Sequence, residues 1–197
     1  MSIELSVKLI RPTKMADILT EAECRLSGVP HGPFRLMEPV VDPSDLLLGP
    51  SRWEDDALIS DGRVAKVGLW VMYHRRLDEL QPRGREPTDA ERRAIEEMAG
   101  YWAMIDAGVL RTRASFCLAA LIACGIASRN RSRILDESNR LQQGQWADPD
   151  ALSAVFARFK DADSFEEFAD AFCDEVDFAR DWPSARADLA ERKVRLN

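Results

Sequence analysis

A run of twelve residues without a charged side chain, from Phe116 to Ala127, constrains this chain more than any other segment. As a helix it would be about 18 Å long, whereas a bilayer span requires roughly 20 apolar residues. A helix that is apolar on every side is normally buried inside a protein. Its small residues, Ala119, Ala120, Ala123 and Gly125, would let neighbouring elements approach closely. The run therefore predicts a buried central helix and not a membrane span.

Alternating apolar and polar side chains predict strands around this helix. Residues 3–9 alternate cleanly, and residues 57–73 form a hairpin about the turn Ser60-Asp61-Gly62. The second arm of that hairpin is apolar on both faces, which is typical of a central strand covered on both sides. Shorter strands are expected at residues 34–37 and 133–138.

Capping signals predict the remaining helices. Thr13 can cap a helix that runs to about Leu26. The capping box Thr88-Asp89-Ala90-Glu91 opens a helix that we expect to continue to Gly108, with Trp102 and Ile105 on its buried face. Asp148-Pro149 and the box that begins at Ser164 open two more, the second reaching about Phe178.

This order of elements predicts an α+β fold, with a mostly antiparallel sheet covered by helices and a ferredoxin-like core. We expect one domain over residues 1–197, with a sheet-containing core at 1–140 and a helical C-terminal extension at 148–197. The N-terminal residues have the alternation of a strand and lack the pattern of a signal peptide, so we expect a cytoplasmic protein.

The most pronounced chemical feature is an acidic segment at residues 161–181. It contains nine acidic residues and a single basic one, Arg180, while the whole chain has a net charge of −7. The carboxylates recur every three or four residues, opposite a phenylalanine face, so they form one side of an amphipathic helix. Such a row is either a solvated face or a docking surface for a basic partner, whose approach it would accelerate.

We take the docking surface as the functional hypothesis, with tryptophans as its apolar anchors. The candidate partner-binding residues are Asp163, Glu166, Glu167, Asp170, Asp174, Asp177, Trp146 and Trp182.

Other classes of function are less well supported. Cys24, Cys117, Cys124 and Cys173 form no C-x-x-C pair and only two histidines are present, so we expect buried thiols, no metal site and no cofactor. Arginines are dense between residues 75 and 133, but the acidic total makes nucleic acid an unlikely partner. We expect those arginines to pair with nearby acids.

No nucleotide-binding or hydrolase motif occurs in the chain. His74, at the end of the predicted central strand, is the best single catalytic candidate, so a small enzyme centred on His74 remains an alternative. An adaptor subunit of a stable complex is a third hypothesis.

The succession of elements resembles a known class of protein. An N-terminal strand, a helix, a central strand at 64–73, an alanine-rich helix at 114–127 and a strand carrying Ile134-Leu135-Asp136 resemble the small α+β immunity proteins of bacterial toxin systems. The resemblance covers residues 1–140 in arrangement only, and no catalytic residues are carried over from it. It implies a cytoplasmic, non-catalytic protein that binds one toxin and blocks its active site.

Overall fold

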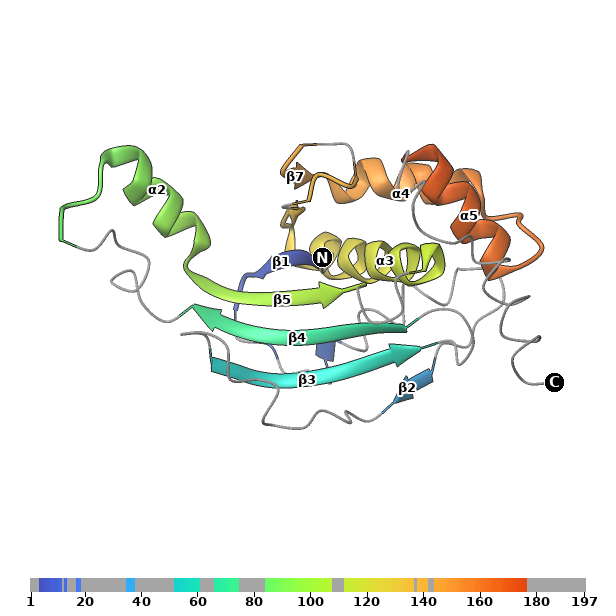
Figure 1. The fold of residues 1–197 in the computed structure, drawn as a ribbon, viewed down its shortest axis with the longest axis horizontal. Helices are drawn as coiled ribbons and strands as arrows, with labels where there is room; N and C mark the ends of the chain where they lie inside the picture. The colour runs from blue at the N-terminus through green and yellow to red at the C-terminus, as the bar shows by residue number, and fades with distance from the viewer. Residues whose placement is uncertain are drawn as a thin grey trace.

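The protein has an α+β fold in which helices are layered on one antiparallel sheet. The computed structural model describes residues 4–11, 13, 17–18, 35–37, 52–60, 66–74, 84–107, 112–136, 138–141 and 144–176. The long helix α3 (Arg113–Asn130) packs on the sheet, and α4 (Pro149–Arg158) and α5 (Phe165–Glu175) lie beyond it (Figure 1). The helix α2 (Asp89–Met98) extends to the other side, away from this stack.

The sheet has seven strands in the order β2-β3-β4-β5-β1-β6-β7, and every neighbouring pair is antiparallel. The stretch β6-β1-β5-β4 has the strand order of a ferredoxin-like core, with β2 and β3 added at one edge and β7 at the other. The strands are β1 (Glu4–Leu9), β2 (Arg35–Met37), β3 (Arg52–Ser60), β4 (Lys66–His74), β5 (Gly100–Asp106), β6 (Ile134–Leu135) and β7 (Trp146–Ala147).

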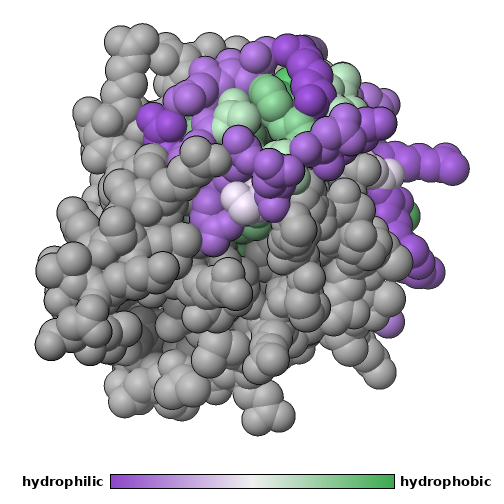
Figure 2. Space-filling view, turned by 90° about the vertical axis from the view of Figure 1, so that its right-hand side faces the viewer, coloured by the Kyte–Doolittle hydropathy of each residue, from purple (hydrophilic) through white to green (hydrophobic). Residues whose placement is uncertain are grey.

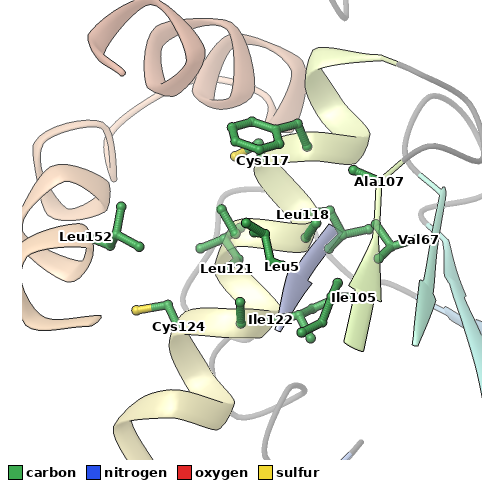
Figure 3. Packing of buried hydrophobic residues seen from close by; sticks show 14 of the residues in the cluster. Leu5, Val67, Ile105, Ala107, Cys117, Leu118, Leu121, Ile122, Cys124 and Leu152 are labelled. Atoms are coloured by element: carbon green, nitrogen blue, oxygen red, sulfur yellow. The ribbon is translucent and has the colours of Figure 1, made fainter. Parts of the chain in front are cut away.

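Helix α3 is the buried centre that its sequence predicts. Leu118 and Ile122 point toward the sheet, where they meet residues of β1, β4 and β5, while Cys124 points toward α4 (Figure 3). The helix begins at Thr112, whose hydroxyl accepts a hydrogen bond from the Ser115 N–H at 3.1 Å. No helix in the described part of the chain is long and apolar enough to cross a membrane.

Several predicted strands and helices are confirmed. The N-terminal strand, the strand at 34–37 and the hairpin correspond to β1, β2 and the pair β3–β4. The Asp148-Pro149 and Ser164 signals open α4 and α5 as expected. Of the helix predicted from Thr13 to Leu26, only Asp17 and Ile18 are described as helical, and the rest lies outside the described residues.

The predicted helix from Thr88 to Gly108 is wrong in its second half. The helix ends at Met98, Ala99 is extended, and Gly100 has φ +119°, a conformation that favours glycine. The following residues form β5, which pairs with β1 on one side and β4 on the other. Spacing alone placed Trp102 and Ile105 on a helix. In the structure, the backbone N–H and C=O groups of this segment pair with a strand on each side, and this tertiary pairing overrides the helical spacing.

The prediction for the region after α3 is partly wrong. The expected strand at 133–138 contains only Ile134 and Leu135, and an unpredicted short strand, β7, places Trp146 opposite Leu135. Asp136 is fully buried and bends the chain out of β6, because its Oδ2 accepts the Leu141 N–H at 2.7 Å. The side chain thereby stabilises a turn between the two short strands.

Candidate partner-binding surface

The candidate surface is formed by α5 and the segment that joins it to α4. The Ser164 hydroxyl caps α5 by accepting the Glu167 N–H at 3.1 Å, and Glu167 Oε2 in turn accepts the Asp163 N–H at 3.1 Å. Phe165, Phe168 and Phe172 are buried beneath the helix. Phe172 stacks on Phe156 of α4 with ring centroids 4.6 Å apart, which fixes α5 against its neighbour. The helix is therefore amphipathic as predicted.

Two carboxylates at the end of α5 pair with arginines from other helices. Asp174 Oδ1 accepts a hydrogen bond from Arg113 Nη1 of α3 at 2.7 Å, and Glu175 pairs with Arg158 of α4. The Asp174 side chain is 70% exposed, whereas that of Arg113 is 15% exposed. The arginines hold these carboxylates in place and relieve part of the repulsion within the row.

The remaining predicted acids differ in exposure. Asp163 is exposed, Glu167 and Asp170 are half-buried, and Glu166 is only 9% exposed. Glu166 thus lies on the inner side of the helix and outside the exposed row. Asp161, which was not among the candidate residues, is exposed in the loop before α5. We refer to Asp161, Asp163, Glu167, Asp170, Asp174 and Glu175 as the acidic surface.

Partly exposed apolar residues adjoin this surface. Val155 and Phe159, four positions apart at the end of α4, are half-buried, as is Ala162 in the loop that follows. The Ala162 N–H donates to the Phe159 carbonyl at 3.1 Å, which keeps Ala162 close to the end of α4. We call Val155, Phe159 and Ala162 the apolar strip. Figure 2, which views the α5 side of the molecule, shows hydrophobic surface enclosed by hydrophilic residues. An apolar centre with a charged rim is the usual composition of a protein interface.

The two candidate tryptophans do not join this surface in the described structure. Trp146 is half-buried on β7, beside the start of α4, whereas α5 lies beyond the other end of α4 (Figure 1). Its ring centroid is 6.3 Å from that of Trp102, and its carbonyl accepts a hydrogen bond from Arg133 Nη2 at 2.5 Å. Trp182 and Asp177 lie outside the described residues.

The cysteines near α5 are packed as apolar residues. Cys117 of α3 and Cys173 of α5 are buried, and burial raises the pKa of both thiols. The nearby Asp170 carboxylate raises both pKa values further. Both thiols are therefore protonated at neutral pH and are poor nucleophiles. Within the described ranges, no group of three or more His, Cys, Asp or Glu side chains could hold a metal ion.

His74 is the last residue of β4, where it pairs with Gly100 of β5. Its side chain lies outside the described part of the structure. The position at the end of a central strand agrees with the sequence prediction, and a catalytic role for His74 stays a prediction.

Sequence reasoning missed which acids are already paired. Arg113 and Asp174 are 61 positions apart, so no local spacing indicates their contact. The high density of arginines was the available signal, because an arginine that becomes largely buried, as Arg113 does, is stable only with a hydrogen-bonded or charged partner. Comparison of the chain with protein-family models, curated proteins and solved structures finds no match.

Proposed function

We propose that this chain is a non-catalytic binding protein that neutralises a basic protein partner, and specifically an immunity protein that blocks a bacterial toxin. The observation that carries the proposal is the concentration of charge. Residues 144–176 contain nine acidic and two basic residues, so this stretch alone has a net charge equal to that of the whole chain, −7.

The acidic surface and the apolar strip would contribute differently to binding. Exposed carboxylates accelerate the approach of a basic partner and select against acidic ones. Burial of Val155 and Phe159 against the partner would supply affinity, because apolar contacts at the centre of an interface dominate its energy. The proposed partner therefore presents an apolar residue surrounded by lysines or arginines.

The internal ion pairs identify the acids that meet a partner first. Asp174 and Glu175 are already engaged by Arg113 and Arg158. A basic partner has to share or displace those arginines to reach them. Asp161 and Asp163 are exposed in the loop ahead of α5, so we expect the first contacts there.

The test is a pull-down from the source cells with the tagged wild-type protein at low and moderate salt, followed by affinity measurements on the captured protein. We expect one basic protein in fixed ratio, with binding that weakens as salt rises. The variant Asp161→Lys/Asp163→Lys should reduce the affinity about tenfold or more, since two attractive contacts become repulsive.

The matched control is Glu86→Lys/Glu96→Lys, which changes the net charge equally but at exposed positions around α2. It should retain most of the affinity. Equal losses in both variants would mean that only net charge matters, and would contradict a specific acidic surface. Failure to capture any basic protein at either salt concentration would overturn the proposal.

A further inference from the structure

The two ends of α3 lie in surroundings of opposite charge. The helix begins beside α5, where Arg113 contacts Asp174, and it ends beside β6 (Figure 1). Two exposed arginines, Arg129 and Arg131, lie at that C-terminal end. With 18 residues the helix is about 27 Å long. An acidic and a basic surface are thus held apart by a rigid element at opposite ends of one molecule.

The basic end also carries an exposed apolar residue. The Ile10 N–H donates to Asn130 Oδ1 at 3.4 Å, and Asn130 Nδ2 donates to the Ile126 carbonyl at 2.8 Å, which places the chain after β1 against the end of α3. Ile10 is 72% exposed and is the one large hydrophobic residue in the described ranges classed as exposed. Arg11 beside it is exposed as well. We call Ile10, Arg11, Arg129 and Arg131 the Ile10 patch.

The backbone of the patch includes an unusual position. Arg131 has φ 49° and ψ 41°, the left-handed conformation that ends many helices and that glycine adopts most readily. Its N–H donates to the Ser128 carbonyl at 3.3 Å, and the Ser132 N–H donates to the Ala127 carbonyl at 3.0 Å. Glycine would complete this helix end with less strain, so an Arg131→Gly variant removes the side chain without opposing the backbone conformation.

We propose that the Ile10 patch docks on the acidic surface of a second copy of this chain. The charges are complementary, because Ile10 is accompanied by Arg11 and by the arginines on either side of Asn130, and carboxylates adjoin the strip of Val155, Phe159 and Ala162. The two surfaces lie at opposite ends of α3, so the contact forms between molecules and joins them head to tail. The repulsion between chains of net charge −7 opposes long assemblies.

This contact would cover the acidic surface in the absence of another basic protein. A basic partner would then compete with the Ile10 patch for the same carboxylates. The self-association needs no such partner, and it is tested on the purified chain alone. A purified protein that does not self-associate would leave the proposed function untouched. A pull-down that captures no partner would in turn say nothing about self-association.

The experiment is sedimentation velocity over a concentration series at low and moderate salt, with two complementary variants. Ile10→Ser/Arg131→Gly removes the apolar residue and one of the three arginines of the patch, and glycine at position 131 should preserve or raise the unfolding temperature. Asp161→Asn/Asp163→Asn weakens the acidic surface and keeps the patch. We expect the wild-type protein to associate with increasing concentration. For each variant alone, the dissociation constant of self-association should rise about tenfold or more.

Mixing the two variants provides the sharpest test, because each retains one intact surface. A head-to-tail contact predicts a 1:1 complex in the mixture that does not grow further. The control Arg92→Ala, which removes an exposed arginine from α2, should associate as the wild type does. A wild-type protein that stays monomeric throughout would overturn the proposal. If the monomeric wild type bound to a heparin column and the Ile10→Ser/Arg131→Gly variant did not, the patch would be assigned to an anionic polymer instead. Association of both variants at wild-type strength would also overturn it.

Discussion

Helices α3 and α2 of this protein are stabilised by opposite means. Nearly every side of α3 is buried, against the sheet below and against α4 and α5 above. Helix α2 extends away from that stack, and Ile95 is its one described side chain classed as buried. Most of the described hydrogen bonds that involve α2 side chains form a network at its own N-terminus. Glu91 accepts hydrogen bonds from the Thr88 N–H at 2.8 Å and from Arg85 Nη1 at 2.7 Å.

The comparison teaches that core packing determines the free energy of global unfolding, whereas hydrogen bonds at the end of one helix determine how easily that helix opens locally. Removal of a contact from α3 should weaken the whole fold, because the sheet and the outer helices both rest on that helix. Removal of a contact from α2 should loosen α2 alone, in a local opening that leaves the rest folded.

The largest expected effect is that of Leu118→Ala. Leu118 is fully buried between α3 and the sheet, so the substitution should lower the free energy of global unfolding by about 2–5 kcal/mol. Urea denaturation followed by fluorescence measures this. The matched variant Ile95→Ala on α2 should shift the global midpoint much less, and equal shifts in the two variants would break the comparison.

A smaller effect is expected from the loss of one helix cap. Thr88→Ala removes the hydroxyl that accepts the Glu91 N–H, which should destabilise α2 by about 1 kcal/mol. Hydrogen exchange should quicken in α2 while the global midpoint stays in place. The same substitution at Thr112, the buried cap of α3, should move the global midpoint instead. A global shift caused by Thr88→Ala would contradict the local stabilisation of α2.

The smallest effect is a pH dependence confined to α2. Hydrogen bonding to Arg85 and Thr88 lowers the pKa of Glu91 from 4.5 to about 2. Because the pKa of Glu91 is lower in the folded helix than in the unfolded chain, ionised Glu91 stabilises the helix at pH values above the unfolded-state pKa. This stabilisation is lost as the pH falls through the folded-state pKa of about 2. NMR titration of the Glu91 carboxyl, with the α2 amides as reporters, should show this loss. The first turn of α3 has no acidic residue and should not respond, so a titration of both helices together would refute the assignment.

The sequence predicted the elements whose signals are local. The apolar run gave α3, alternation gave β1 and the β3–β4 hairpin, and capping boxes gave the starts of α2 and α5. It failed at β5, because Trp102 and Ile105 also fit a helical period and only pairing with distant strands decides between helix and strand.

The candidate surface was predictable to a similar degree. The amphipathic character of α5 follows from its phenylalanines and carboxylates, which lie three or four positions apart. The burial of Glu166 and the pairing of Asp174 with Arg113 depend on how α5 crosses its neighbours. That crossing is set by aromatic contacts between helices, such as Phe172 on Phe156, and spacing within one helix does not encode it.

The place of β1 in the sheet has a consequence for biosynthesis. Although β1 precedes the other described strands, its two neighbours are β5 and β6, roughly 100 and 130 residues further along the chain. At a synthesis rate of about 5–20 residues per second, β1 waits on the order of 5–25 s before both partners exist. Both edges of an apolar strand are unpaired during that interval, which is when a nascent chain is most prone to aggregate. We therefore expect expression yield to depend on chaperones that shield the N-terminal strand until α3 and β6 have left the ribosome.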